Sequence, residues 1–512
     1  MIEALRSPAA YRHAVTAVTV AETHISWVLL TGEFAYKIKK PVRLQFLDFS
    51  TLEQRHFFCV EELRLNRRTA SELYLDVVTI AGTRERPIIE GAGEPLEYAV
   101  RMRQFPADAL LIDRLKAGLV TAENVDQLAH AIADLHQQAA VAAPDSDFGS
   151  PERVWSAAAG NFHYLGCPGA APEAVAMLQQ WSESAFADCS AAIASRRSSG
   201  FVRECHGDLH AGNIVFLDQN VRLFDGIEFS EDLRWIDVLS DVGFTVMDIA
   251  HHGFADMGHR LLNTYLERTG DYGGLRVWQF YLVYRALVRA KVAAIKLSQQ
   301  MDSKSGDSRA ELSRYLEQAA SDVRGRRPAL FITHGVSGSG KTSFSQRLLE
   351  RVGAVRVRSD VERQRLDGEG MRATGAASTK DRYAAQVTER TYQKLLSLAA
   401  SILEAGLPAI VDATFLRAAH RRLFRDLAVR MNADYRIVDL RAPEACLRQR
   451  IDLRRAAGGD ASEADQDVLT WQLATREHLA EDELPHVTTV DAECARSQED
   501  ALRRLSRLGL LS

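Results

Sequence analysis

The sequence GVSGSGKT at residues 335–342 constrains the fold more than any other feature of this 512-residue chain. It satisfies the pattern GxxxxGK[ST] and lies between an apolar run, ALFITHG, and an amphipathic run, TSFSQRLLERV. Such a segment joins a strand to a helix, so that backbone N–H groups and the helix N-terminus surround a phosphate. We expect Lys341 to reach the β- and γ-phosphates of a nucleotide and the Thr342 hydroxyl to bind Mg²⁺. The other residues expected to line the phosphates are Gly335, Ser337, Gly338, Ser339, Gly340 and Ser343.

Strand and helix patterns alternate after this loop as well. The apolar runs expected to form strands are ALFITHG, AVRVRSD, AIVDAT, YRIVDL and HVTTV, and helical patterns separate them. This alternation is typical of a parallel sheet covered by helices. The sequence therefore predicts an α/β P-loop domain over residues 328–512, with a parallel five-stranded sheet wrapped by helices.

Polar residues follow the predicted strands, at the sheet edge where open α/β sheets bind ligands. Asp360 and Arg363 follow the second strand; Asp360 would accept a proton from an acceptor hydroxyl, and Arg363 would hold substrate or the transferring phosphate. Asp412 ends the third strand and would order Mg²⁺ or its waters. Arg450 and Arg454 are four residues apart and share one face of a predicted helix, as arginines of a closing lid do.

With these residues the region resembles the P-loop small-molecule and polynucleotide kinases over about 185 residues. Asp360 and Arg363 match the D-x-x-R of the polynucleotide-kinase branch, where the two residues supply a base and an essential arginine. Arg450 and Arg454 match the R-x-x-x-R lid of the same group. A simple ion pair between Asp360 and Arg363 at the strand end is the alternative interpretation of the first pair.

A second motif, HGDLHAGN, occupies residues 206–213. Asp208 and Asn213 are five positions apart, and Asp225 follows a further apolar run. A catalytic loop needs one carboxylate near the acceptor hydroxyl and an amide oxygen on Mg²⁺, and an adjacent hairpin can bring a second carboxylate to the metal. The order of these residues is that of the protein kinases.

In this form the motif resembles the aminoglycoside phosphotransferases and choline-kinase-like enzymes, over roughly residues 20–300. The resemblance implies an α+β bilobal protein-kinase-like domain, with an N-lobe at residues 1–105 and a helical C-lobe at residues 106–300. It also implies Asp208 as catalytic base, Asn213 and Asp225 as metal ligands, and His206 as a support for the loop. Two acidic residues downstream are open between a supporting role and a surface position: Glu228 and Asp241.

The implied fold requires a strand lysine for the nucleotide phosphates and a helix glutamate that holds it. Lys37 in FAYK and Glu62 on the following helix fit these roles, with Lys39 and Glu61 as rivals. Residues 100–102 are expected to form the hinge between the lobes, with Met102 beside adenine.

Composition excludes several other classes of protein. The chain has 63 Lys and Arg against 68 Asp and Glu, and 46% of its residues are hydrophobic, which is typical of globular domains and not of a disordered polyelectrolyte. Its six scattered cysteines contain no CxxC pair, and no apolar run approaches the roughly 18 residues of a membrane span. We therefore expect free thiols and a cytoplasmic protein. The polar residues 301–327 are expected to form a linker.

Together the two motifs predict two modules that use ATP and Mg²⁺ to phosphorylate hydroxyl groups of small molecules. One alternative makes one module a non-catalytic nucleotide-binding regulator of the other. A second alternative makes the P-loop module an RNA or polynucleotide 5′-hydroxyl kinase, since residues 331–460 contain eight more basic than acidic residues, including Arg421, Arg422 and Arg425. Apart from Phe424, no aromatic residue lies between these arginines, so the sequence does not favour nucleic acid.

Overall fold

The chain forms two compact units in the computed structural model of the protein. The first unit comprises Met1–Gly160 and Ile193–Ile249, and the second comprises Asn161–Ala192 and Ala250–Ser512. Among the described helices, none is both long enough and apolar enough to cross a membrane. The structure describes residues 1–44, 47–167, 169–218, 220–299, 305–324, 328–374, 385–457 and 464–508.

The first unit is built on an antiparallel sheet of six strands in the order β1-β2-β3-β8-β6-β7. The central strand β3 brings Lys37 opposite Val28 on one side and Val100 on the other. Leu29, Ile38 and other apolar side chains of these strands are buried in one core. The strands are β1 (Thr19–Glu22), β2 (Ser26–Leu30), β3 (Phe34–Lys39), β6 (Tyr74–Gly82), β7 (Pro87–Ile89) and β8 (Glu97–Arg103), and the short pair β4 (Arg43–Leu44) and β5 (Leu47–Asp48) follows β3.

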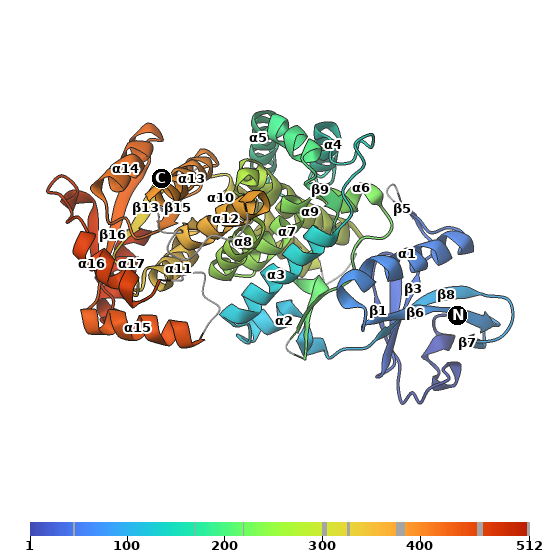
Figure 1. Ribbon diagram of the computed structural model, residues 1–512. Helices are drawn as coiled ribbons and strands as arrows, with labels where there is room; N and C mark the ends of the chain where they lie inside the picture. Colours follow the sequence, from blue (N-terminus) through green and yellow to red (C-terminus); the bar gives the residue numbers. More distant parts are fainter. Residues whose placement is uncertain are drawn as a thin grey trace. The chain divides into compact units, whose positions relative to one another are not determined.

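Helix α1 (Leu52–Ala70) packs on this sheet (Figure 1). Its N-terminus is fixed by a capping box, in which the Thr51 side chain accepts from the Gln54 N–H and the Gln54 side chain accepts from the Thr51 N–H. Cys59 of α1 is buried in a core with Tyr74 and Val100 of the sheet. The helix thereby brings Glu62 to the strand that carries Lys37.

Short strands frame the HGDLHAGN segment in the rest of this unit. β9 (Val202–Glu204) precedes the segment, and β10 (Ile214–Leu217) follows it and pairs with β11 (Asn220–Leu223) as an antiparallel hairpin. Asp225 comes two residues after β11. The remaining elements are α2 (Leu111–Lys116), α3 (Ala122–Gln138), α4 (Pro151–Ala159), α6 (Glu231–Arg234), β12 (Trp235–Asp237) and α7 (Val238–His251).

The second unit contains the predicted five-stranded parallel sheet, in the order β14-β15-β13-β16-β17. The prediction is therefore confirmed, and each expected apolar run forms one strand. The central strand, β13, is almost entirely buried, as expected for a strand covered on both faces. The strands are β13 (Ala329–His334), β14 (Val355–Arg358), β15 (Ala409–Asp412), β16 (Asp434–Arg441) and β17 (Val487–Asp491).

Helices cover both faces of this sheet (Figure 1). On one face Phe344 and Leu348 of α11 pack with Leu502 of α17 against Phe331 and Val438. On the other face α13 and α14 pack together against β13 and its neighbours. The helices are α11 (Lys341–Val352), α12 (Ser359–Thr374), α13 (Ala385–Glu404), α14 (Ala418–Arg430), α15 (Glu444–Ala457), α16 (Gln466–Thr475) and α17 (Ala495–Ser506).

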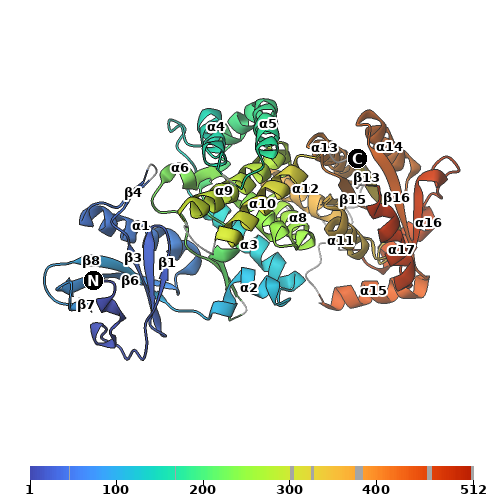
Figure 2. The same ribbon diagram turned by 180° about the vertical axis from the view of Figure 1, so that it is seen from behind.

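A group of helices that precedes the parallel sheet in sequence belongs to the same compact unit. In both views α8 lies beside α11 (Figures 1 and 2). The group consists of most of α5 (Pro172–Ser198), with α8 (Ala255–Thr269), the short 3-10 helix η6 (Tyr272–Val277), α9 (Trp278–Gln299) and α10 (Ser305–Asp322).

Helix α10 differs from what the sequence led us to expect for residues 301–327. Its described part packs along α9 instead of forming a spacer. Leu312, Tyr315, Leu316 and Ala319 are all buried, and they recur at the spacing of one helix face. This apolar stripe consists of only four residues. Because polar residues surround them, the sequence pattern resembles that of a linker.

We expect Leu312→Ala to lower the free energy of unfolding by about 2–5 kcal/mol, because the Leu312 side chain is fully buried and its loss leaves a cavity. Arg314→Ala, on the exposed side of α10, should change it by no more than about 0.5 kcal/mol. Urea titrations followed by circular dichroism measure both. Equal effects of the two substitutions would mean that α10 does not pack as described.

Candidate active sites

The HGDLHAGN loop of the first unit is held by buried carboxylates of α7. Asp241 accepts the N–H groups of His206 and Gly207 at 3.0 and 2.9 Å, and Asp248 accepts the N–H of Ala211 at 2.9 Å. Both carboxylates are buried. Asp241, whose role the sequence left open, therefore supports the backbone of the loop.

Asp208 and Asn213 contact each other within this loop. The Asn213 side-chain amide donates to the Asp208 carbonyl at 2.9 Å and lies 3.3 Å from Asp208 Oδ2. His206 Nε2 lies 2.9 Å from the Phe224 carbonyl, so the imidazole ties the loop to the residue before Asp225. Burial lowers the pKa of His206, which favours the neutral ring in this structural position.

Lys37 joins α1 to the segment after β11. Its ammonium lies 2.7 Å from Glu62 and also contacts Asp225. Burial alone would lower the pKa of Lys37, but Asp225 and Glu62 outweigh it and hold the pKa well above its usual value. The predicted lysine, helix glutamate and metal-binding aspartate are thus in direct contact.

A second lysine lies deeper in the same cluster. Lys39 is fully buried, 2.7 Å from Glu62, and it also contacts Glu228. Burial would raise the pKa of Glu62, but Lys37 and Lys39 together lower it to about 2. For Glu228 burial outweighs Lys39, and its pKa is raised. Glu228 is therefore a buried partner of Lys39 and not a surface residue.

The rival glutamate, Glu61, faces away from both lysines and pairs with Arg64 at 2.9 Å. Met102, expected at a hinge, lies inside β8 opposite Ala35 and Tyr74. Its backbone is therefore flanked by strands on both sides. The first residue beyond this strand is Gln104, whose N–H donates to the Glu33 carbonyl.

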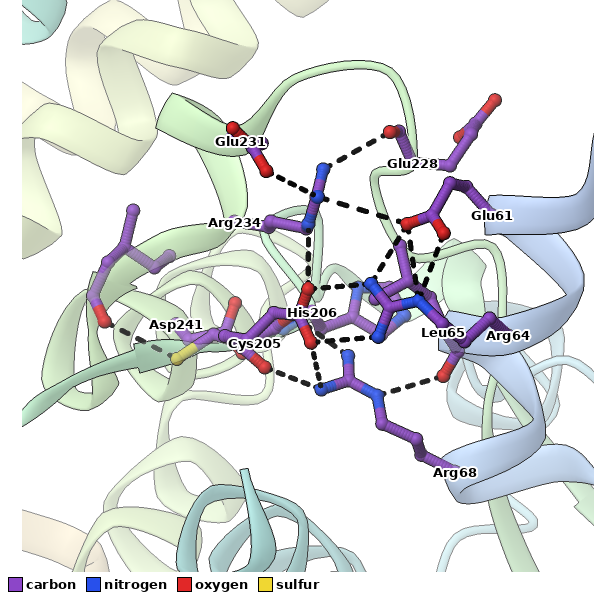
Figure 3. Close-up of polar contacts among 12 residues, drawn as sticks. Glu61, Arg64, Leu65, Arg68, Cys205, His206, Glu228, Glu231, Arg234 and Asp241 are labelled. Atoms are coloured by element: carbon purple, nitrogen blue, oxygen red, sulfur yellow. Dashed lines mark hydrogen bonds and ion pairs between the residues drawn. The ribbon is translucent and has the colours of Figure 1, made fainter. Parts of the chain in front are cut away.

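Three arginines shown in Figure 3, Arg64, Arg68 and Arg234, lie beside the start of the HGDLHAGN loop. Their nearest nitrogen atoms lie 2.7, 3.7 and 3.1 Å from the carboxylate of Glu204, a residue that the sequence did not single out. Arg64 donates to both Glu204 oxygens at 2.7 and 3.1 Å, and Arg234 donates to Oε1 at 3.1 Å. Arg68 donates to the Glu204 and Cys205 carbonyls at 2.6 and 3.2 Å. Because Arg64 and Arg68 belong to α1, this cluster fastens α1 to the strand that leads into the loop.

The GVSGSGKT loop of the second unit follows β13 and ends in α11, as predicted. Gly335 and Gly338 have φ of 145° and 81°, which favour glycine. A Cβ atom would come 2.8 Å from the Leu440 carbonyl at Gly335 and 2.8 Å from the Leu447 carbonyl at Gly338. Neighbouring backbone on both sides therefore requires glycine at these two positions.

A cavity of about 1170 Å³ opens over this loop. It is lined by predicted residues from the loop and the start of α11, from the first turn of α12, from the end of β15 and from α15: Ser337, Gly338, Gly340, Lys341, Thr342, Ser343, Asp360, Arg363, Asp412, Arg450 and Arg454. Gly335 and Ser339 lie in the loop but do not line the cavity; the Ser339 hydroxyl is buried without a hydrogen-bond partner among the described residues.

Lys341, at the start of α11, and Asp412, at the end of β15, both line this cavity. Lys341 donates to the Val336 carbonyl at 2.8 Å, and burial lowers its pKa although Asp412 and Asp360 oppose the shift. Asp412 is buried and lies 3.3 Å from the Ser345 hydroxyl. An anionic phosphate would compensate the half-buried ammonium of Lys341.

The remaining predicted side chains already have polar partners. Arg363 lies 2.5 Å from Asp360, so the ion pair that the sequence left as an alternative is present. Arg450 contacts Glu493 and donates to the Gly338 carbonyl at 3.3 Å, while Arg454 donates to the Ala464 carbonyl at 2.8 Å. Both arginines, which the sequence placed on one face of a helix, belong to α15 and line the cavity.

The basic residues considered for RNA binding are not one open surface. Arg421 is fully buried and donates to both oxygens of Glu483 at 2.7 and 2.9 Å. Arg425 pairs with Asp482 at 2.7 Å. Arg421 stabilises the core at α14 and cannot contact a polymer.

Comparison with known proteins supports both motifs. Residues 103–280 match the model of the phosphotransferase enzyme family, and residues 330–479 match that of an AAA domain. The resemblance to an aminoglycoside-phosphotransferase-like region followed by a P-loop kinase-like region is therefore confirmed. One protein from Mycobacterium bovis and two from strains of Mycobacterium tuberculosis are each 29% identical over 418 residues, which cover 80% of this chain and 81% of the relative.

Among solved structures, similarity is found to a gluconokinase from Sinorhizobium meliloti and a sugar kinase from Janibacter. These are 23% and 20% identical, cover 36% and 35% of this chain and 95% and 94% of their own, and have TM-scores of 0.26 and 0.27. A Plasmodium vivax ethanolamine kinase is 8% identical, with a TM-score of 0.37, and the match covers 60% of this chain and 82% of the kinase.

Removing the Glu204 carboxylate should destabilise the first unit. Glu204→Ala leaves the buried Arg234 and its neighbours without their common anion, and we expect a loss of about 3–5 kcal/mol in the free energy of unfolding. Glu231→Ala, whose side chain is 65% exposed, should cost at most about 1 kcal/mol. Urea unfolding measures both variants, and a Glu204→Ala protein as stable as Glu231→Ala would contradict the packing described.

The low pKa of Glu62 predicts a particular dependence of stability on pH. A carboxyl whose pKa falls from 4.5 to about 2 on folding stabilises the protein fully above pH 4.5, by about 3 kcal/mol, and loses this contribution as the pH falls toward 2. Glu62→Gln should therefore flatten the decline of unfolding free energy between pH 5 and pH 3. Glu123→Gln, an exposed change on α3, should not. An unchanged decline in Glu62→Gln would refute the assignment.

Proposed function

We propose that the chain is an ATP-dependent phosphotransferase with two active sites, each of which transfers the γ-phosphate to a hydroxyl group of a small molecule. The observation that carries the proposal is that each unit gathers a lysine, a carboxylate and further oxygen ligands in one region. In the first unit Lys37 contacts Asp225, and His206 connects the residue before Asp225 to the loop that holds the Asp208–Asn213 pair. In the second unit Lys341, Asp412 and Asp360 line one cavity.

The proposal includes the domain organisation expected from sequence. Residues 1–105 and 106–300 would act as the two lobes of a kinase-like domain, with residues 328–512 as the P-loop domain. The family matches at 103–280 and 330–479 fall within these limits. Six free cysteines fit a reducing cytoplasm.

In the first site Asp208 would orient the acceptor hydroxyl and accept its proton. The hydroxyl oxygen forms a bond to the γ-phosphorus, the bond from that phosphorus to the β–γ bridging oxygen breaks, and ADP leaves. Lys37 would hold the phosphates, with Glu62 keeping its ammonium in place. Adenine would meet the chain near Met102 and the residues that follow β8.

In the second site the same bonds form and break, with Asp360 as the proton acceptor. Lys341 and the N–H groups of the loop would bind the β- and γ-phosphates. Arg450 or Arg454 would neutralise charge that develops on the transferring group. Arg363, which pairs with Asp360, would hold the substrate or the transferring phosphate.

Both sites contain the oxygen ligands that Mg²⁺ prefers. Asn213 and Asp225 would hold it in the first site, and Thr342 and Asp412 in the second. When bound, Mg²⁺ neutralises phosphate charge and orients the β- and γ-phosphates. These four residues fit Mg²⁺ because each of them offers a carboxylate, amide or hydroxyl oxygen and none offers sulfur or imidazole nitrogen.

The test is Mg²⁺-dependent ATP consumption with sugars, amino alcohols, aminoglycosides, nucleosides and 5′-hydroxyl oligonucleotides as acceptors. Asp208→Asn should lower one acceptor-stimulated activity by about 10²–10⁴-fold, and Lys341→Ala should lower a different one by about 10²–10³-fold. The matched controls are Asp232→Asn and Arg351→Ala, which change exposed ion pairs of the same units.

If neither variant removes any acceptor-stimulated activity, the proposed function is wrong. If one variant removes all turnover and the other none, the silent unit is a nucleotide-binding regulator. If only the 5′-hydroxyl oligonucleotide responds to Lys341→Ala, the P-loop unit is a polynucleotide kinase.

A further inference from the structure

Helix α8 covers the free edge of the parallel sheet. β14 is an edge strand, and an uncovered edge leaves backbone N–H and C=O groups without partners. The buried side chain of Asn263 donates to the Ala354 carbonyl at 2.9 Å and accepts from the Arg356 N–H at 2.7 Å. One amide of α8 therefore pairs with β14 in the way that a neighbouring strand would.

One turn further along α8, Glu267 receives two arginines of the same strand. Arg358 donates to Oε1 at 2.8 Å, and Arg356 lies 3.5 Å from Oε2. Arg358 lines the P-loop cavity, whereas Arg356 is buried beneath it. Burial lowers the pKa of Arg356, and Asp412 and Glu267 oppose that shift.

Arg356 in turn contacts the start of α11. Its Nη1 donates to the Thr342 carbonyl at 3.1 Å and to the Ser345 hydroxyl at 3.1 Å. The same hydroxyl lies 3.3 Å from Asp412 Oδ2. A continuous set of hydrogen bonds and ion pairs therefore leads from Glu267 to Thr342 and Asp412, the two residues that would hold Mg²⁺ at the P-loop.

We infer that Glu267, acting through Arg356, positions the Mg²⁺ ligands of the P-loop, so that this nucleotide site is completed by a helix outside the P-loop domain. The inference rests on the proposed function of that site. α8 lies within residues 103–280, which match the phosphotransferase enzyme family. The candidate nucleotide site in residues 330–479 is thus supported by a helix that lies in the other family match, at residues 103–280.

The electrostatics give the direction of the effect. Glu267 and Asp412 both attract the buried guanidinium of Arg356, Glu267 as an ion pair at 3.5 Å and Asp412 across the Ser345 hydroxyl. Without Glu267, the attraction to Asp412 is the one that remains of these two. Arg356 would then compete with Mg²⁺ for Asp412. Groups that orient metal ligands typically change metal affinity by 10–100-fold when they are removed.

The experiment is Mg²⁺ titration of fluorescent-ADP binding to the full chain, counting only the binding that Lys341→Ala abolishes. Glu267→Gln should raise the half-saturating Mg²⁺ concentration about 10-fold, with little change in binding measured without Mg²⁺. Arg260→Gln is the matched control, because Arg260 lies on the same helix and pairs with Glu350 at 2.8 Å. It should leave the Mg²⁺ titration unchanged.

A double-substitution cycle separates positioning from a general loss of packing. If Glu267 acts through Arg356, Glu267→Gln should have no further effect in an Arg356→Gln protein. Equal additive effects in both backgrounds, or an equal shift in Arg260→Gln, would overturn the inference. Arg356→Lys replaces Arg356→Gln if that protein fails to fold.

The result also distinguishes this inference from the proposed function. If the wild type shows no fluorescent-ADP binding that depends on Lys341, both are wrong. If it binds and Glu267→Gln titrates like the wild type, the nucleotide site stands and the role of Glu267 is wrong.

Discussion

The first unit depends on the mutual neutralisation of charges that water does not reach. Glu62 has no exposed surface, yet it faces two ammonium groups at 2.7 Å, and Lys39 is equally buried. An isolated charge at this depth is strongly destabilising, so each member of the cluster requires the others. The position of α1, the conformation of the segment at Asp225 and the placement of Lys37 are consequently fixed together. The Glu204 cluster repeats this arrangement on the next turns of α1.

In the second unit, backbone groups rather than buried ion pairs surround the candidate phosphate site. The glycines of its loop allow close approach of the Leu440 and Leu447 carbonyls, and the N-terminus of α11 faces the same cavity. Lys341 is half-buried there, and burial lowers its pKa although Asp412 and Asp360 oppose the shift. Lys37 and Lys39 each have a carboxylate partner at 2.7 Å, whereas the Lys341 ammonium donates to the Val336 carbonyl.

The sequence was sufficient to predict those features of the fold and the sites that short residue patterns encode. The P-loop and the five parallel strands follow from local spacing and alternation, whereas the contact of Lys37 with Glu62 was implied by the resemblance of the HGDLHAGN segment to kinase-like enzymes. Contacts between distant segments were not predictable in the same way. Glu204 lies in a short strand that carries no recognisable motif. In the sequence Arg356 cannot be distinguished from other basic residues, because its contacts with Thr342 and Ser345 are known only from the structure. Arg421 was misleading for the same reason, since a buried arginine and an exposed one look alike in sequence. Met102 shows that strand ends are difficult to place from pattern alone.

The hydrogen bonds of the Asn263 amide to β14 determine how a fragment without α8 would behave. By pairing with Ala354 and Arg356, it occupies the edge at which a sheet could otherwise recruit a strand from another molecule. A fragment that begins at the parallel sheet would present that edge to other copies of itself and would be prone to aggregate. The parallel sheet therefore depends on a helix that precedes it in sequence within the same compact unit, because α8 covers the edge that would otherwise be open to other copies.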